Sequence, residues 1–235
     1  AMLPSDSQTS AGRIPKLKPQ VKMPAASVVQ FLSQQEIKVL RRLLLEPADY
    51  VHDEHFDRPD AEQLVRRSPR TFRGPKVTSD DSGRFGLDEF VSQLDREQFL
   101  FLRLNYCRRR VYRLLQSHAG RRLSEVAARE LLSWERLVAE TRGEIVRDNV
   151  PLVLAMGKRT KITGVDLTDL ISDGNLALMR AVNKFDCARG YKFSTYACRA
   201  ILKSFSRVAT RTTRHRGHFP TEFEPTLERS NLLEQ

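Results

Sequence analysis

Apolar residues recur every three to four positions along most of this chain, and that spacing predicts amphipathic helices. The first runs from Val28 to Leu45, where Ser33 and Glu36 form a capping box that starts the helix proper. Pro47 follows and ends it, because proline cannot continue a helix. No stretch alternates apolar and polar residues as a strand would. The pattern therefore predicts an all-α protein.

Two longer helices are expected in the middle of the chain. Asp95 with Gln98 forms a capping box for a helix reaching about Ser117, and a second helix begins after Ser124. Pro151 should kink or restart this second helix. Their apolar stripes are Phe90, Leu94, Phe101, Leu104, Val111 and Leu115 in the first, and Ala127, Leu131, Trp134, Val138, Ile145 and Leu152 in the second. Five arginines crowd the first helix, and we expect most of them to be solvated: Arg103, Arg108, Arg109, Arg110 and Arg113.

Two further helices complete the pattern. Asp166 is the expected N-cap of the first, whose apolar face comprises Leu167, Leu170, Ile171, Leu178, Ala181, Val182 and Phe185. A turn over residues 186–190 leads to the last helix, which Ser194 or Thr195 would cap. The apolar side of that helix is Ala197, Ile201, Phe205 and Val208.

Composition divides the chain into five parts. Residues 1–26 form a basic arm that we expect to be disordered, either as a solvated tail or as an arm that touches nucleic acid. Residues 27–65 form a small helical segment, 66–86 a linker, and 87–216 the main helical domain. Residues 217–235 begin a further linker or a truncated next domain. The small segment either packs on the main domain or is a separate module, and it could cover a basic surface with its acids Asp49, Asp53, Glu54, Asp57, Asp60 and Glu62.

The charge balance narrows the possible partners. A formal net charge of +11 and a pI near 9.9 favour nucleic acid, an anionic membrane or an acidic protein. No run of about 18 apolar residues is present to span a membrane, and the N-terminus lacks the apolar core of a signal peptide. Cys107, Cys187 and Cys198 have no paired spacing, which predicts a reducing compartment and neither a disulfide nor a zinc site. We therefore expect a cytoplasmic protein with no membrane partner.

Two histidines raise the alternative of a metal site. His52 and His55 lie close together among acids, but a third convergent ligand is missing from the spacing. We expect both in a solvated loop, with no metal and no cofactor.

The last helix carries a clear chemical signal. Between Cys187 and Thr221 the chain has eight cations and no acid. At 100° per residue, five cations fall within an arc of about 120° opposite the apolar side; we call them the basic stripe, and they are Arg199, Lys203, Arg207, Arg211 and Arg214. Cations four residues apart can meet successive phosphates, whereas an ordinary solvated face usually has interleaved acids. The expected nucleic-acid contacts here are Lys192, Arg199, Lys203, Ser206, Arg207 and Arg211.

Aromatic residues flank the start of that helix. They are Phe185, Tyr191, Phe193 and Tyr196. A base that leaves a duplex loses stacking, and an aromatic pocket beside cations can replace it. The alternative is that the rings fill the core, and for Phe185 and Phe193 both interpretations stay open. The hydroxyls of Tyr191 and Tyr196 favour contact with nucleic acid.

Acids gather on the preceding helix. Asp166, Asp169 and Asp173 form what we call the acidic ridge. Two carboxylates four residues apart could serve as an acid/base or metal pair. No nucleophile motif or glycine-rich phosphate loop accompanies them, so we identify no catalytic residue and expect no enzyme. The ridge is better suited to docking a basic partner helix.

The stretch DLISDGNLALMRAVNKFD…RGYKFSTYA, preceded by RDNVPLVLAMGKR, resembles conserved region 2 of bacterial sigma factors of the sigma-70 class. The resemblance is close over residues 144–208 and more diffuse over 87–143. It implies a helical domain that binds the clamp helices of the RNA polymerase β′ subunit and opens the promoter −10 element. The polymerase-binding residues would be Asp166, Asp169, Ser172, Asp173 and Asn175. Capture of a flipped non-template adenine would carry over to Phe185, Arg189, Tyr191, Phe193, Thr195 and Tyr196.

This sequence departs from the family pattern at specific positions. Primary members have a tryptophan pair that wedges against the bubble, where this chain has Arg199 and Ala200. Leu202 and Lys203 replace an arginine and a glutamine, and the glutamine helps to read the upstream base pair. Ser172-Asp173 replaces the usual Gln-Glu of the acidic helix. The resemblance thus implies a divergent, alternative sigma factor with a different −10 preference.

Two hypotheses follow for function. The first is a non-enzymatic specificity subunit that binds polymerase core and the non-template strand of the −10 element. The second is a single-stranded nucleic-acid-binding module that no longer binds polymerase. An anti-sigma factor could mask the acidic ridge, although no residue in the sequence points to one.

Overall fold

The computed structural model describes residues 12–70, 72, 94–160, 162 and 165–218, and these are mostly helical. The helices are α1 (Ala26–Val29), α2 (Gln34–Leu45), α3 (Gln63–Arg66), α5 (Arg96–Ser117), α6 (Glu125–Arg159), α7 (Leu167–Lys184) and α8 (Phe193–His218), with 3-10 turns η1 (Glu54–Asp57) and η2 (Cys187–Arg189). The all-α prediction is confirmed with one difference. Two-residue strands β1 (Gly12–Arg13) and β2 (Val51–His52) pair antiparallel, and a ribbon this short leaves no alternating pattern in the sequence.

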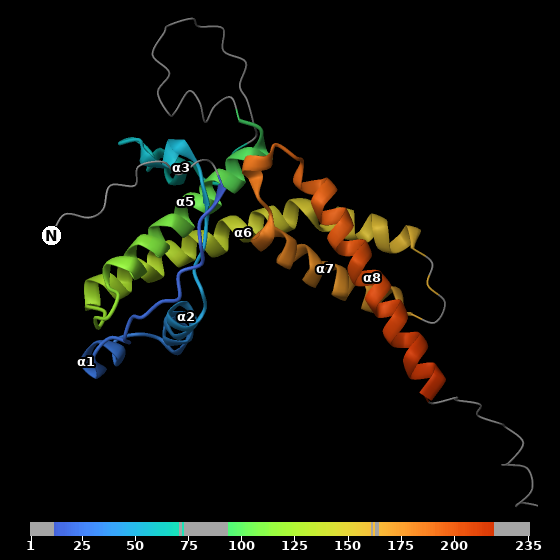
Figure 1. The fold of residues 1–235 in the computed structure, drawn as a ribbon, viewed down its shortest axis with the longest axis horizontal. Coiled ribbons are helices and arrows are strands. Elements are labelled where there is room, and N and C mark those ends of the chain that lie inside the picture. Colours follow the sequence, from blue (N-terminus) through green and yellow to red (C-terminus); the bar gives the residue numbers. More distant parts are fainter. Residues whose placement is uncertain (1–11, 71, 73–93, 161, 163–164, 219–235) are drawn as a thin grey trace, which may run out of the picture.

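The two longest helices, α5 and α6, lie side by side and form the spine of the molecule (Figure 1). The predicted capping box at the start of α5 is present, with the Asp95 carboxylate accepting from the Gln98 backbone N–H at 2.7 Å. Ser124 caps α6 as expected. The predicted restart of the helix at Pro151 is wrong, because α6 continues through that residue. Pro151 is exposed, and buried Ile145 and Val153 on either side hold both halves of the helix against the core.

Helices α7 and α8 pack on each other and on the C-terminal half of α6 (Figure 1). The predicted apolar side of α8 is entirely buried, at Ala197, Ile201, Phe205 and Val208. A Cβ placed on Gly174 of α7 would stand 2.6 Å from Cγ1 of Val153 and 3.1 Å from Cε1 of Phe205. The absent side chain at Gly174 therefore sets how closely the three helices approach.

The short helices at the N-terminal end pack on this spine rather than forming a separate module. Leu40 of α2 shares a cluster with Leu115 of α5 and Leu131 of α6, and Leu64 of α3 belongs to the main core. The capping box predicted at Ser33 is present and starts α2. Phe31, which falls within the predicted helix from Val28 to Leu45, lies in the turn before α2 and is 70% exposed. The residues 12–72 that the structure describes are called the N-terminal segment below.

The prediction of a disordered arm over 1–26 is wrong for residues 12–26; residues 1–11 lie outside the described part of the chain. The N–H of Ile14 donates to the Tyr50 carbonyl at 2.9 Å, and Leu17 and Ala48 exchange backbone hydrogen bonds. Val21 is buried in the second cluster. The sequence did not reveal this ordered path, because the apolar residues here are few, have no helical spacing and each anchor the chain singly.

Two of the five arginines of α5, most of which were predicted to be solvated, are buried and hold the N-terminal segment. Arg103 is 2% exposed and donates to the carbonyls of Val65 at 2.7 Å and Arg67 at 3.0 Å. Arg109 is also buried and bonds to the Phe56 carbonyl and the Asp57 carboxylate. A guanidinium can be buried when each N–H finds an acceptor, and irregular backbone supplies those acceptors.

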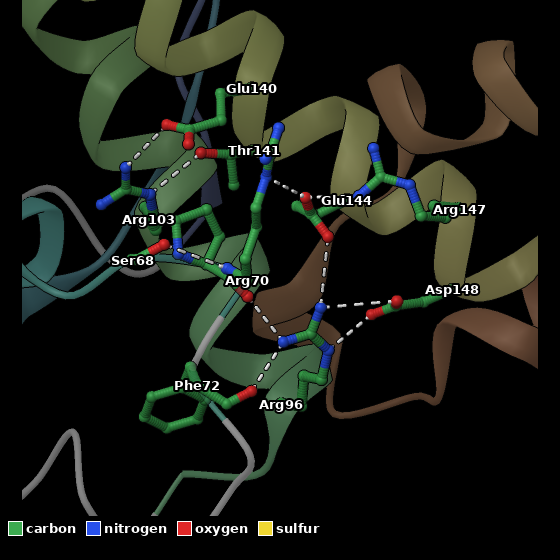
Figure 2. A network of polar contacts seen from close by, with 11 residues as sticks. Ser68, Arg70, Phe72, Arg96, Arg103, Glu140, Thr141, Glu144, Arg147 and Asp148 are labelled. Atoms are coloured by element: carbon green, nitrogen blue, oxygen red, sulfur yellow. Dashed lines mark hydrogen bonds and ion pairs between the residues drawn. The ribbon is translucent and has the colours of Figure 1, made fainter.

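The predicted linker, residues 66–86, begins with an anchored stretch. The Phe72 ring stacks on Phe99 with centroids 4.0 Å apart. Arg96 donates to the carbonyls of Pro69 and Phe72, both at 2.6 Å, and pairs with Asp148 of α6 (Figure 2). Residue 71 and residues 73–93, which include the rest of the linker and Phe90 of the predicted stripe, lie outside the described residues, as do residues 219–235 of the predicted C-terminal linker.

The histidine loop is not solvated as predicted. His52 is 8% exposed in β2 and lies 3.4 Å from the Asp57 carboxylate, while His55 in η1 contacts Asp53. No group of three metal-binding side chains occurs in the part of the chain that the structure describes. None of its described helices has the length and apolar character needed to cross a bilayer.

Candidate nucleic-acid interface

All five side chains of the basic stripe are exposed along α8, as predicted. Four of them, Lys203, Arg207, Arg211 and Arg214, line a shallow hollow of about 510 Å³ together with Ser206 and Thr210. Within the described residues, Lys203 and Arg207 form no salt bridge. The Ser206 hydroxyl donates to the Leu202 carbonyl at 3.1 Å, which leaves its oxygen able to accept. This face offers cations and hydroxyls to a polyanion.

The acidic ridge lies on α7, directly beside the basic stripe. Asp166 and Asp169 are exposed, and Asp166 starts the helix without a side-chain cap bond. Asp173 pairs with Arg211 at 3.1 Å, and its backbone carbonyl accepts from the Ser204 hydroxyl. The acidic ridge and the basic stripe are therefore joined by one ion pair, Asp173 with Arg211, whereas Asp166 and Asp169 remain available to a partner.

Two further side chains of the predicted polymerase contact lie on the same helix. Ser172 is exposed, whereas Asn175 is half-buried. The Oδ1 atom of Asn175 is buried and has no hydrogen-bond partner among the described residues. Leu176 is 43% exposed beside them and, with Val208 of α8, lines an open hollow of about 450 Å³.

Helix α8 begins at Phe193, two or three residues earlier than a cap at Ser194 or Thr195 predicts. The Glu97 carboxylate of α5 accepts from the Phe193 N–H at 2.7 Å. The cap therefore comes from another helix, which no local motif in the sequence could have indicated. It ties the start of the basic helix to the spine of the molecule.

The four aromatic residues of the predicted pocket divide into two pairs. Phe193 is fully buried and Phe185 is 5% exposed, and both rings contact Phe101 of α5. Tyr191 is 72% exposed and Tyr196 is 37% exposed, with the Tyr196 ring 5.7 Å from that of Phe185. The two phenylalanines thus belong to the core and support the surface on which the two tyrosines are exposed. Burial favours the core interpretation for Phe193, whereas Phe185 also lines the hollow described next, and contact of either ring with DNA stays a prediction.

An open hollow of about 740 Å³ lies beside these tyrosines. Its lining includes Tyr191, Thr195, Tyr196 and Arg199 from the start of α8 and its approach, and Lys184, Phe185 and Arg189 from the end of α7 and the turn that follows it. Arg13 and Lys16 of the N-terminal segment also line it. We call this hollow the tyrosine pocket. It combines flat rings with several cations, which suits an unpaired, stacked nucleotide strand.

Comparison with known proteins matches part of this chain to a known family. Residues 145–215, which span the end of α6, all of α7 and most of α8, match the family described as sigma-70 region 2. The chain contains a sigma-70 region 2 domain. The resemblance inferred from the sequence over residues 144–208 is confirmed.

Three relatives carry this domain. The chain is 39% identical over 79 residues to the RNA polymerase sigma factor RpoD of Neisseria gonorrhoeae, covering 34% of this chain and 12% of the relative. It is 46% identical over 84 residues to the principal sigma factor HrdD of Streptomyces griseus, and 47% over 68 residues to HrdC of Streptomyces coelicolor. These cover 34% and 29% of this chain, but 25% and 20% of the relatives. The chain thus spans a quarter or less of the length of each.

Within the region 2 domain, most predicted site residues reach the surface. The exposed ones on the DNA side are Arg189, Tyr191, Lys192, Thr195, Tyr196, Arg199, Lys203, Ser206, Arg207 and Arg211, and those on the polymerase side are Asp166, Asp169 and Ser172, with Asp173 half-buried. Their roles stay predictions. The structure brings the two sets to adjoining faces of α7 and α8, joined at Asp173 and Arg211.

Sequence reasoning missed the cations that the N-terminal segment adds to the tyrosine pocket. Arg13 and Lys16 precede the other lining residues of the pocket by more than 160 positions in sequence. The one available signal was the excess of lysine and arginine over acids in residues 1–26, which had left a nucleic-acid-binding arm open as an alternative.

The cysteine nearest the pocket is not a reactive group. Burial raises the pKa of the Cys187 thiol to about 11, with the nearby acids Asp186 and Asp53 adding to the shift. The thiol is therefore protonated at neutral pH and a poor nucleophile. Cys187 instead contacts the Asn105 amide at 3.8 Å, and Asn105 in turn accepts from the Val51 backbone N–H.

Proposed function

We propose that this chain acts as an RNA polymerase sigma factor, a promoter-specificity subunit that binds the polymerase core and recognises and melts the −10 element. The observation that supports this most is the region 2 match over α7 and α8, where exposed acids and exposed cations occupy adjoining faces. The acids would dock on the basic clamp helices of the β′ subunit. The cations and tyrosines would hold promoter DNA.

The proposed melting needs no catalytic residue. Tyr196 and Tyr191 present rings on which an unpaired base can stack, and the basic stripe presents cations to the phosphates beside it. Stacking on an aromatic ring is worth about 1–3 kcal/mol per base, so binding the open strand shifts the equilibrium away from the duplex. Energy comes from binding alone, and no nucleotide is hydrolysed.

The proposed upstream contact differs from that of primary sigma factors. Arg199 is exposed at the rim of the tyrosine pocket, at a position where primary members have a tryptophan. A guanidinium can bind a phosphate or stack on a base, but it is a weaker wedge than an indole ring. We therefore expect a weaker or altered preference at the upstream edge of the −10 element.

The test of polymerase binding is a pull-down with isolated β′ clamp helices. Asp169→Arg is the informative variant, because Asp169 is exposed and forms no ion pair among the described residues. Glu125→Arg is the control charge reversal, at an exposed acid in the first turn of α6 that pairs with Arg129 of the same helix. We expect Asp169→Arg to lose binding and Glu125→Arg to retain it. Wild-type protein that fails to bind would reject the polymerase role.

A single-stranded nucleic-acid-binding module remains the second candidate, because the tyrosine pocket and basic stripe suit any unpaired strand. It predicts oligonucleotide binding without clamp binding. Arg211→Ala separates the two surfaces, since it removes a cation from the stripe and frees Asp173. Under the sigma-factor proposal this variant weakens DNA binding and leaves clamp binding intact.

A further inference from the structure

The tyrosine pocket is built from two parts of the chain that are distant in sequence. One wall comes from the region 2 domain and the other from residues 13–16 of the N-terminal segment. The family match does not extend to that segment, since it begins at residue 145. The N-terminal wall is therefore a feature that region 2 alone does not supply.

Backbone hydrogen bonds fix the path of this wall. Arg13 pairs with Val51 in the β1–β2 ribbon, and Ile14 donates to the Tyr50 carbonyl at 2.9 Å. Leu17 and Ala48 exchange backbone bonds of 2.8 and 2.9 Å. Residues 13–17 are thus held on both sides of Lys16, and the ribbon is itself attached to α5 by the bond from Val51 to Asn105.

The wall is also attached to the region 2 domain. Nη2 of Arg13 donates to the Asn183 carbonyl in the last turn of α7 at 3.1 Å, and Nη1 lies 3.4 Å from Asp49. Figure 1 shows the segment crossing the spine where α7 ends. A cation at a helix C-terminus is favourable, so this contact holds the two walls together.

The combined lining is strongly positive. It contains five cations, Arg13, Lys16, Lys184, Arg189 and Arg199, and one acid, Asp186, which pairs with Arg189 at 3.3 Å. Lys16, Lys184 and Arg199 form no salt bridge within the described residues. Several uncompensated cations around two exposed tyrosines match a strand that carries phosphates and flat bases at the same time.

We propose that Lys16 and Arg13 bind phosphates of the unpaired promoter strand, so that the N-terminal segment forms part of the DNA site instead of covering it. This rests on the proposed function, since it takes the strand in the tyrosine pocket to be promoter DNA. The earlier idea that acids of the segment cover the basic surface is wrong for the described contacts: Asp57 and Glu62 pair with Arg109 and Arg110 of α5.

The test measures binding of the full 235-residue chain to a fluorescein-labelled single-stranded DNA oligonucleotide of about 12 nucleotides by anisotropy. Lys16→Glu is the main variant, because its side chain is exposed and its loss breaks no contact that holds the fold. Lys18→Glu is the matched control, an exposed lysine two residues away and outside the pocket lining. We expect Lys16→Glu to weaken binding by roughly tenfold and Lys18→Glu by no more than about twofold.

Salt dependence gives a second readout. Each phosphate contact on a single strand contributes about 0.7 to the slope of log affinity against log salt. Lys16→Ala should therefore lower that slope by about 0.7. Clamp-helix binding should be unchanged in all of these variants, because none of them lies on the acidic ridge.

The outcomes separate this proposal from the one it rests on. Equal affinities for Lys16→Glu and Lys18→Glu, with Tyr196→Ala still losing binding, would overturn the role of the N-terminal segment and leave the DNA-binding function standing. No binding by the wild-type chain would overturn both. An equal effect of Lys16→Glu on duplex DNA would overturn the unpaired strand as the occupant.

Discussion

Two aromatic residues three positions apart at the start of α8 lie in opposite environments. Phe193 is fully buried against Phe101 and Phe185, whereas Tyr196 is 37% exposed at the tyrosine pocket. Phe193→Ala should lower the free energy of unfolding by about 3–5 kcal/mol, because it opens a cavity in the core. Tyr196→Ala should lower it by only about 1 kcal/mol, through loss of the ring contact with Phe185, while weakening binding of single-stranded DNA.

Urea unfolding followed by circular dichroism gives both free energies, and anisotropy gives the DNA affinity. A large loss of stability in Tyr196→Ala would contradict this division between core and surface. The sequence alone did not decide between core and surface for Phe185 and Phe193, since a buried ring and an exposed ring can occur at the same helical spacing. Phe101 decides between them, because it comes from α5 and fills the space beneath both rings.

Element packing depends on a glycine at the crossing of α6, α7 and α8. Gly174→Ala would place a Cβ within 2.6 Å of Val153 and 3.1 Å of Phe205. Overpacking costs about 1–3 kcal/mol, and the higher helix propensity of alanine returns up to about 1. We expect a net loss of about 1–2 kcal/mol in thermal or urea unfolding.

Gly143→Ala is the matched control for this substitution. Gly143 lies on an exposed face of α6, and a Cβ there meets nothing within 4 Å. It should stabilise the protein by about 0.5–1 kcal/mol, because only the propensity difference remains. Destabilisation of similar size at both glycines would show that the close approach at Gly174 does not limit the packing.

Helix positions were predictable where local chemistry sets them. The capping boxes at Ser33 and Asp95 and the N-cap at Ser124 are all present, because each depends on residues three positions apart. The start of α8 was predicted too late, since Glu97 supplies its cap from another helix. The restart predicted at Pro151 does not occur, because packing of α6 on both sides of the proline outweighs the one hydrogen bond that it removes at an exposed carbonyl.

For the whole molecule, the chemistry of the region 2 domain could be predicted because it is local in sequence: one helix carries the acids and one carries the cations. The position of the N-terminal segment could not be predicted, because long-range contacts attach it to the helices. Arg103, Arg109 and Arg13 reach backbone carbonyls 36 to 170 residues away. An arginine on a helix is usually solvated, and nothing in its own neighbourhood shows that an irregular segment will cover it.

Arg103 tests how strongly that segment is held. Its guanidinium donates to the carbonyls of Leu64, Val65 and Arg67. It also donates to the Thr141 hydroxyl of α6 (Figure 2). Arg103→Met keeps the apolar stem but leaves these acceptors without a donor, and each unsatisfied buried acceptor costs about 1–3 kcal/mol. We expect the free energy of unfolding to fall by about 3 kcal/mol or more, and amide hydrogens of residues 50–66 to exchange faster with solvent than those of α7 and α8.

Arg129→Met, which removes only an exposed ion pair with Glu125, should change stability by less than about 1 kcal/mol. Unchanged exchange over residues 50–66 in Arg103→Met would mean that apolar packing alone retains the segment, and the wall it adds to the tyrosine pocket would then persist without the buried arginine.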